Sequence, residues 1–375
     1  MDSTAAVAVI DVSALQILVD ALRARSYTVI GPTVRDGAIV LAELGSADEL
    51  PYGWGVRLEP GGYRLRPRPD RAAFGHAAGP QSWKTYLHPA RQRLWSIDRT
   101  NDAPATADNE PAPRLAFLGV RPCDLRAIGI LDRVLAGGRH PDPGYQGRRD
   151  GVVIVAVECT EPGETCFCTS MGTGPAAGNG YDLALTEVVE DGSHRFLARV
   201  GTELGADLLG LLPRQGADAE IQAKAEAAVA AAADRMGRSM PPVSLPELMA
   251  GSREARRWED VASRCLTCGN CTMVCPTCFC TTTEDVADLT GAHAERWQRW
   301  DSCFDLDFSY LHGGSVRTSG VSRYRQWMTH KLGTWYDQFG SSGCVGCGRC
   351  IVWCPVGIDI TEEAAALQAE REAGP

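Results

Sequence analysis

Apolar residues recur along the first half of the chain at spacings that predict both helices and strands. Residues 13–24 carry apolar positions at helical spacing, with Ser13 as the expected N-cap. Short strand-like runs follow at 28–30 and 38–44. Further on, alternation around an Asp-Gly turn predicts a hairpin at 181–200, and an alanine-rich stretch predicts a helix at 218–236.

Two continuous apolar runs, 115–120 and 152–157, are typical of strands that are buried on both faces. Between them lies a helical pattern at 125–136, with Asp124 as its expected cap. A strand, a helix and a second strand in this order favour parallel pairing. The predicted fold class is therefore an α/β N-terminal domain with a short, mainly parallel sheet, followed by a C-terminal domain of helices and loops.

Composition changes divide the chain into three expected parts. Residues 1–112 read as an α+β segment that ends in an exposed loop at 101–113, which is rich in proline, alanine and acidic residues. Residues 113–236 form the α/β domain. Residues 237–375 form a cysteine-rich domain that begins with a linker.

The bulk composition excludes some classes of protein. The 375 residues are 44% hydrophobic and 22% charged, as in ordinary globular proteins, and the net charge of −10 argues against a nucleic-acid partner. The N-terminal residues lack the basic segment of an export signal, and no apolar run is long enough to cross a membrane. We therefore expect a cytoplasmic protein whose 15 cysteines bind metal or react, and do not form disulfides.

The cysteines of the last domain form two runs with the same spacing, C-x2-C-x2-C-x3-C-P. This spacing is that of bacterial two-cluster ferredoxins, in which the fourth cysteine of each run binds the other cluster. Zinc knuckles, the alternative, close with two pairs of cysteines instead. The expected 4Fe–4S ligand sets are Cys265, Cys268, Cys271 and Cys354 for one cluster, and Cys344, Cys347, Cys350 and Cys275 for the other.

Four more cysteines follow the two buried strands. Cys123 lies just after the first strand, and Cys159, Cys166 and Cys168 follow the second. The carboxyl ends of parallel strands meet at one edge of a sheet, so these thiols are expected in one crevice. We predict a third 4Fe–4S cluster there; the alternatives are a zinc site, a reactive thiol pair or ordinary buried cysteines.

Three cysteines, Cys278, Cys280 and Cys303, are left between the two runs. Asp301 or a hydroxyl group could complete a ligand set with them, but we favour a role around the clusters, where they would tune the reduction potential. Lys84 and His88 lie in an aromatic segment for which surface packing is the simpler interpretation. The G-x-G-x-x-A match at 172–177 neither follows a strand directly nor opens a helix, so it is rejected as a dinucleotide motif.

Taken together, five motifs resemble a known family. They are RPCDLRAIGILD (121–132), C-x6-CFC (159–168), CxxCGNCxxxCPTCFC (265–280), RWDSC (299–303) and CVGCGRCxxxCP (344–355). This ordered set resembles the beta subunit of cytoplasmic NAD(P)-linked nickel–iron hydrogenases of the sulfhydrogenase type. It is also similar to the related iron–sulfur component of anaerobic sulfite reductase. Residues before about 80 match weakly, and no role is assigned to them.

The resemblance implies an electron-transfer subunit without catalytic residues of its own. Its 4Fe–4S clusters would relay electrons between a flavin- and NAD(P)-binding subunit and the small subunit of a soluble hydrogenase, with the large subunit completing the complex. FAD, NADH or NADPH, and the nickel–iron centre would then belong to partner subunits. Two alternatives remain: a component of a sulfite reductase complex, and an N-terminal domain that itself binds flavin or substrate.

Overall fold

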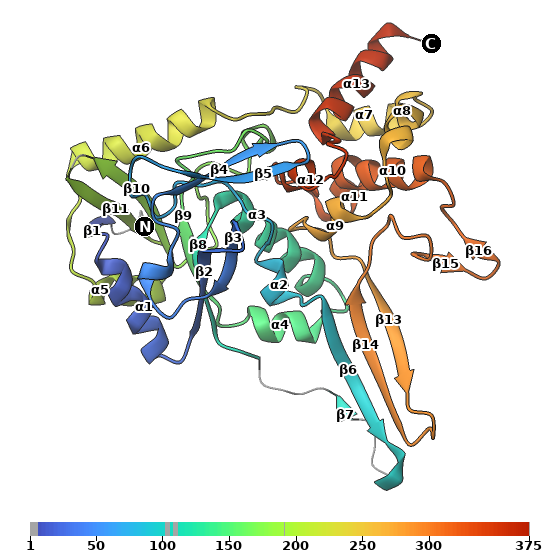
Figure 1. The fold of residues 1–375 in the computed structure, drawn as a ribbon, viewed down its shortest axis with the longest axis horizontal. Coiled ribbons are helices and arrows are strands. Elements are labelled where there is room, and N and C mark those ends of the chain that lie inside the picture. The colour runs from blue at the N-terminus through green and yellow to red at the C-terminus, as the bar shows by residue number, and fades with distance from the viewer. Residues whose placement is uncertain (1–6, 102–105, 108–111, 191, 375) are drawn as a thin grey trace.

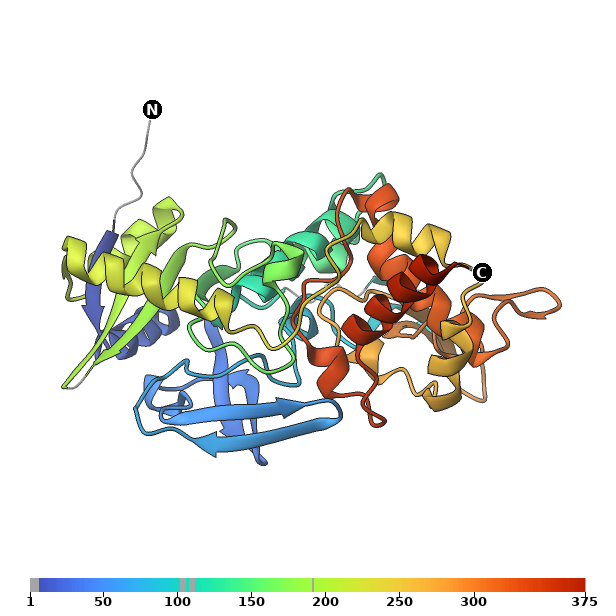
Figure 2. The same cartoon turned by 90° about the horizontal axis from the view of Figure 1, so that it is seen from above.

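The computed structural model describes residues 7–101, 106–107, 112–190 and 192–374. A lobe built on a large sheet lies beside a helical C-terminal lobe, and a slender β-arm extends from the side of the helical lobe (Figures 1 and 2). The predicted loop at 101–113 and the turn residue at 191 lie wholly or largely outside the described residues. Within the described residues, no helix is long and apolar enough to cross a membrane.

The sheet of the first lobe has eight strands, and parallel pairing is confined to its centre. β2, β8, β9 and β10 run parallel to their neighbours, whereas the strands on both sides are antiparallel. In spatial order the strands are β12 (Gln215–Gly216), β1 (Val7–Asp11), β11 (Ser193–Val200), β10 (Leu183–Glu190), β9 (Val153–Val157), β8 (Leu115–Val120), β2 (Thr28–Arg35) and β3 (Ala38–Glu43).

The expected short, mainly parallel sheet is thus a larger, mixed sheet. One reason is a tight hairpin between β2 and β3, in which Asp36 and Gly37 both have positive φ angles of 48° and 75°. Such a two-residue turn forces its two strands to be antiparallel. The hairpin predicted at 181–200 is confirmed as β10 and β11.

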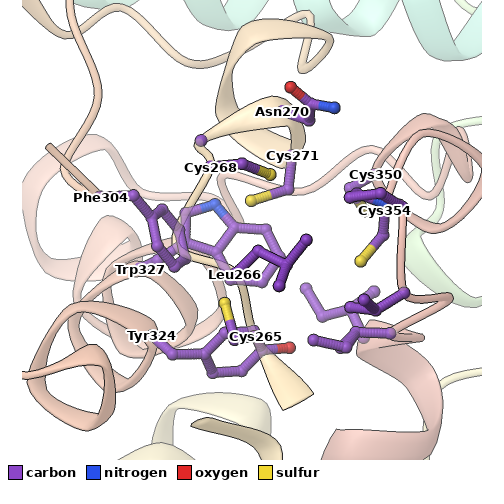
Figure 3. A pocket seen from close by; sticks show the side chains of 15 residues that line it. Cys265, Leu266, Cys268, Asn270, Cys271, Phe304, Tyr324, Trp327, Cys350 and Cys354 are labelled. Carbon is purple, nitrogen blue, oxygen red and sulfur yellow. The ribbon is translucent and has the colours of Figure 1, made fainter. Parts of the chain in front are cut away.

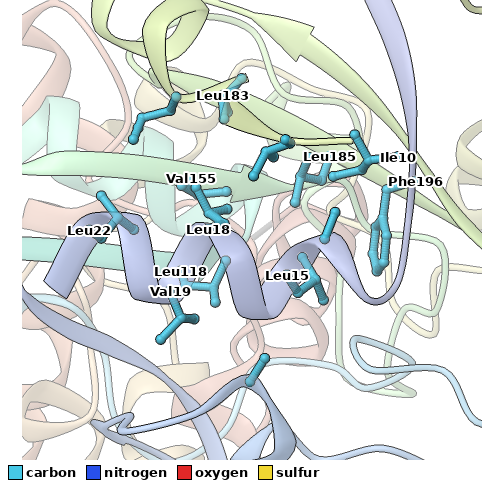
Figure 4. Close-up of a cluster of buried hydrophobic side chains, with 14 of the residues drawn as sticks. Ile10, Leu15, Leu18, Val19, Leu22, Leu118, Val155, Leu183, Leu185 and Phe196 are labelled. Carbon is cyan, nitrogen blue, oxygen red and sulfur yellow. The ribbon is translucent and has the colours of Figure 1, made fainter. Parts of the chain in front are cut away.

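Helices cover both faces of this sheet. On one face, α1 (Ala14–Ala24) and α5 (Glu203–Leu211) bury Leu15, Leu18 and Leu208 against the strands (Figure 4). On the other face, α3 (Pro122–Leu131) packs on β8 and β9, and α6 (Ala219–Asp234) packs on β10 and β11. The helices predicted at 13–24 and 218–236 are confirmed, but the Ser13 side chain makes no capping hydrogen bond.

The helix after β8 begins earlier than its apolar pattern predicts. It starts at Pro122 with Arg121 as its N-cap residue, and continues beyond residue 131 as a π-helical turn, Asp132–Ala136. The prediction that Asp124 caps this helix is therefore wrong. Proline suits the first helical position because it has no N–H to leave unpaired. Asp124 instead lies inside the first turn, where it is free to bind a distant partner.

The helical lobe packs short helices around an aromatic and aliphatic core that includes Trp258, Phe304 and Trp327. Phe167 from the first lobe is part of the same core. The helices are α7 (Leu245–Gly251), α8 (Arg257–Arg264), α9 (Asn270–Met273), α10 (Gly320–Thr329), the π-helical turn His330–Thr334, α11 (Trp335–Phe339), α12 (Arg349–Val352) and α13 (Ile360–Ala373).

The β-arm joins segments that are far apart in the sequence, because β14 of the C-terminal part pairs with β6 of the N-terminal part. Residues 1–112 therefore contribute to both lobes, and the division into 1–112, 113–236 and 237–375 stays a prediction. The remaining elements are β13 (Thr281–Ala287), β14 (His293–Trp300), β6 (Arg91–Asp98), β7 (Thr106–Ala107), the hairpin β4 (Trp54–Glu59) and β5 (Gly62–Pro67), α2 (Lys84–Leu87), α4 (Pro143–Arg149), β15 (Tyr310–Leu311) and β16 (Gly314–Ser315).

Candidate metal centres

The two cysteine runs fold in the same way. In each, a glycine with a left-handed backbone precedes a four-residue helix: Gly269 (φ 76°) before α9 and Gly348 (φ 72°) before α12. Residues other than glycine rarely adopt this conformation. The turn bends the chain sharply between the second and third cysteine of the run, which explains why glycine stands at this place in both.

The first candidate site is a pocket lined by the first three cysteines of run one and by Cys354 of run two (Figure 3). Phe304, Tyr324 and Trp327 close one side of it with aromatic rings. Burial raises the pKa of the Cys271 thiol well above its ordinary value. Cys268 is exposed, so this site lies at the surface of the lobe.

The second candidate site lies deeper. The Cys344 thiol is buried, and its charge would interact with those of Cys347 and Cys275. Burial raises the pKa of Cys344 to about 12. The pKa of Cys275 is lowered instead, chiefly by a hydrogen bond from Cys278, against the effect of burial and with help from the Lys331 ammonium.

The four N-terminal cysteines line a single, largely apolar pocket at the carboxyl ends of β8 and β9. Cys123 comes from the first turn of α3, Cys159 follows β9, and the other two lie in the loop after it. Burial raises the pKa of all four thiols, that of Cys168 to about 12. The pocket is lined by Ala77, Ala78, Arg121, Pro122, Cys123, Cys159, Pro162, Cys166, Cys168, Pro175, Met236, Gly346 and Cys347.

The second cysteine run forms one wall of this N-terminal pocket. The Phe167 amide donates a hydrogen bond of 2.8 Å to the Gly346 carbonyl oxygen. A Cβ atom on Gly346 would lie 2.6 Å from the backbone of Cys168, so only glycine fits there. Next to this contact, Arg349 donates two hydrogen bonds of 2.8 and 2.9 Å to the buried Asp124 carboxylate. The two sites are thus fixed rigidly to each other.

The chemistry of these pockets fits iron–sulfur clusters. Thiolates are the ligands of such clusters, yet burial without a metal disfavours the thiolate form, as the raised pKa values show. A bound metal centre would remove that penalty. Among the described residues, no group of three or more His, Cys, Asp or Glu side chains is arranged so that it could hold a single metal ion.

The remaining three cysteines lie next to the second site and are not among the residues that line the pockets described above. Cys278 contacts Cys275, and the thiol of Cys280 lies near that of Cys303. Their roles stay predictions. In contrast, the prediction that Lys84 and His88 pack at the surface is wrong, because each is only 3% exposed. A buried lysine is rare enough that its position needs an explanation.

Residues before 80, to which the sequence assigns no role, also reach the second run. The Gly61 amide at the tip of the β4–β5 hairpin donates a 3.1 Å hydrogen bond to the Ile351 carbonyl oxygen. Tyr63 of β5 stacks on Trp353 at a ring distance of 5.7 Å. Nothing in the local sequence of the hairpin indicates these contacts.

Comparison with known proteins identifies the family. Residues 264–358 match the model of the 4Fe-4S dicluster domain. The chain is also 32% identical over 299 residues to sulfhydrogenase 2 subunit beta of Pyrococcus furiosus, in an alignment that covers 77% of this chain and 82% of the relative. The chain belongs to the sulfhydrogenase beta-subunit family. No solved structure matches it.

As a member of this family, the chain is an iron–sulfur subunit, and its matched domain spans both cysteine runs. Family membership and the dicluster domain support a role in electron transfer within a multi-subunit complex. The N-terminal thiol pocket lies outside the matched residues, so its contents rest on the geometry alone.

Proposed function

We propose that this beta subunit is the electron relay of a soluble nickel–iron hydrogenase. Three 4Fe–4S clusters would be held at the three thiol sets and would carry electrons between a flavin- and NAD(P)-binding subunit and the hydrogenase small subunit. A cluster of this kind supplies a one-electron centre. Catalysis would take place on partner subunits in the cytoplasm.

The observation that carries this proposal is the way in which neighbouring sites share walls. Cys347, assigned to the second site, also lines the N-terminal pocket. Cys350, assigned to the same site, also lines the pocket of the first site. The three sites therefore form one continuous series, with the second in the middle, as a relay requires.

The side chains around this series suit it to electron transfer. Trp327, Tyr324 and Phe304 pack beside the first site and exclude water, which limits the reorganisation that accompanies each electron. The exposed Cys268 and the 60% exposed Leu266 bring the first site to the surface, where a partner could dock. The N-terminal pocket would form the other end of the series.

Anaerobic purification of the native complex tests the proposal. We expect co-purifying hydrogenase subunits, nickel, flavin and NAD(P)-dependent hydrogen turnover, with about twelve irons in the beta subunit for three cubes. About eight irons would remove the third cluster. Iron without nickel, together with siroheme and sulfite reduction, would move the chain to a sulfite reductase complex.

A second candidate function, ligand binding by the N-terminal domain itself, is favoured by one pocket. This open pocket of about 470 Å³ lies next to the N-terminal thiols and is lined by glycine-rich residues 172–180 together with Arg126 and Arg149. Its size suits a small organic ligand. If it holds flavin, the isolated chain will show a flavin absorbance band; an isolated chain that neither carries nor takes up flavin excludes that ligand.

A further inference from the structure

Lysine is almost absent from this chain, which uses arginine for nearly all its positive charge. Of the 37 basic residues only three are lysines: Lys84, Lys224 and Lys331. Lys224 is an ordinary surface residue that pairs with two glutamates of α6 and β10. Lys84 and Lys331 are each only 3% exposed. Lysine is among the residues least often buried without a charged partner.

Both buried lysines converge on the short segment that begins at Cys275. The Lys331 ammonium lies 3.4 Å from the Cys275 sulfur and donates hydrogen bonds of 2.9 Å to Thr277 Oγ1 and 3.1 Å to the Gly343 carbonyl oxygen. From another direction, the Lys84 ammonium donates to the Cys278 carbonyl oxygen at 3.0 Å.

Aromatic rings complete the surroundings of both ammonium groups. Lys84 lies 3.8 Å from the centre of the Trp300 ring, and Lys331 lies 4.9 Å from that of Trp335. Neither lysine forms an ion pair with an Asp or Glu among the residues that the structure describes. Carbonyl groups, hydroxyls and rings satisfy the hydrogen bonds but do not neutralise the charge.

A buried ammonium group is stable only beside a compensating negative charge. Burial alone would lower the pKa of Lys331, but the neighbouring Cys275, Cys278 and Cys344 outweigh it, so that this pKa is raised. Lys84 is further from the sulfurs, and burial lowers its pKa. The anion that Lys331 faces is therefore the thiolate set of the second site.

We propose that Lys331 sets the reduction potential of the centre assigned to Cys275, Cys344, Cys347 and Cys350, and that Lys84 acts on the same centre more weakly. This inference rests on the proposed function, because it requires a cluster at that site. Reduction adds one electron from the upstream donor and breaks no bond. An ammonium that contacts a ligand sulfur stabilises the added negative charge and raises the potential. Lys331 is thus a positioning residue for charge.

The inference gives the middle centre of the series a distinct character. Neither of the outer thiol sets has a buried lysine beside it, since the third lysine of the chain is on the surface. We therefore expect the middle centre to be reduced more easily than it would be with its cysteine ligands alone. The lysine pair, and not the cysteine spacing, distinguishes it from the first site.

Redox titration of the reconstituted full chain, followed by electron paramagnetic resonance, tests this. In K331M the methionine keeps the length of the side chain and removes its charge. We expect one centre to become at least tenfold harder to reduce, a downward shift of about 59 mV for a one-electron couple, with unchanged iron content. The shifted signal should be the one that is lost in Cys344→Ser.

Two further lysine variants complete the test. K84M should shift the same signal in the same direction by a smaller amount, and K224M, the matched surface control, should shift nothing. If K331M loses iron, K331Q, which can still hydrogen-bond to Thr277 and Gly343, is titrated in its place. Unshifted potentials in a fully loaded K331M or K331Q overturn the inference. A wild-type chain that lacks the Cys344-dependent signal overturns the proposed function itself.

Discussion

The two ferredoxin-type sites and the N-terminal thiol pocket are built by different means. Each ferredoxin-type site takes three cysteines from one tight turn, fixed by a left-handed glycine such as Gly269 or Gly348. The N-terminal pocket collects its thiols from the ends of β8 and β9 and from the loop after β9. The first kind of site depends on local spacing, whereas the second depends on the order of strands in a sheet.

This difference decides which substitutions should damage which site. A change in a turn should affect the site that the turn forms, and a change at the contact between lobes should affect both kinds together. Four experiments separate these possibilities.

The largest effect is expected at Gly346, where the two kinds of site touch. Gly346→Ala would place a Cβ 2.6 Å from the Cys168 backbone, so the second run and the N-terminal loop must separate. We expect bound iron to fall by about two thirds, because two of three proposed cubes share this contact. Iron analysis after anaerobic reconstitution measures it.

Gly340→Ala is the matched control for that change. Gly340 has the same φ of 66°, but a Cβ there would meet nothing within 4 Å. The strain of a left-handed alanine is then the only cost, and iron content should stay at the wild-type value. Equal iron in both variants would show that the contact between the lobes does not support the sites.

Cys159→Ser addresses the N-terminal pocket alone. Cys159 follows a strand and takes no part in either cysteine run, so we expect about one third of the iron to be lost while the two ferredoxin-type centres keep their spectra. Cys303→Ser, which changes a half-buried cysteine outside the three proposed sets, should retain all the iron. Loss of the ferredoxin-type signals in C159S would mean that the sites do not form independently.

The ion pair between Asp124 and Arg349 should contribute strongly to stability. Its side chains are 5% and 2% exposed, and Asp124→Asn leaves the Arg349 guanidinium buried without its counter-ion. We expect the free energy of unfolding to fall by about 3–5 kcal/mol, measured by denaturant unfolding at equal iron loading.

Two comparisons control the ion-pair experiment. The double variant D124N/R349M should lose less than the sum of the single changes, since no charge is then left unpaired. Asp285→Asn breaks a similar pair on the exposed β-arm and should not change stability measurably. A D124N variant as stable as D285N would contradict the role of the pair.

The smallest effect is expected from acid titration of His76, beside the N-terminal pocket. Burial, followed by the nearby Arg121 charge, lowers the pKa of His76 to about 3. The unfolded chain therefore binds a proton that the folded chain does not bind, between about pH 6.5 and pH 3. Stability is full above this window and falls as the pH drops through it, by about 1 kcal/mol at pH 5.5.

His76→Phe removes that titration. Thermal unfolding at matched iron loading should show a weaker dependence on pH for the variant below about pH 6.5. Above about pH 7.5 the two slopes should be equal. Identical slopes throughout would show that His76 becomes protonated without cost in the folded chain.

The sequence predicts local features well and distant contacts poorly. The two cysteine runs and the thiols at the ends of the buried strands follow from spacing and strand order, which are properties of neighbouring residues. The pairing of Asp124 with Arg349, 225 residues apart, leaves no local signal, and neither does the pairing of β6 with β14. The local pattern therefore predicts a helix cap at Asp124 and a surface position for Lys84, and both predictions are wrong.

The rarity of lysine was the one available signal for Lys84 and Lys331. A residue type that the chain otherwise avoids, placed near cysteine-rich segments, suggests a selective need for a compact positive charge. Arginine would not meet this need, because its planar group is larger and spreads the charge. Only the fold shows that both lysines reach the same segment.

The shared wall at Gly346 and Cys347 also constrains how the protein is made. During translation Cys123, Cys159, Cys166 and Cys168 leave the ribosome long before residues 346 and 347, which complete the pocket around them. Until then the nascent chain exposes four reactive thiols without their final shelter. Insertion of iron and sulfide must therefore follow synthesis of the second cysteine run, and the growing chain depends on a reducing environment for most of its elongation.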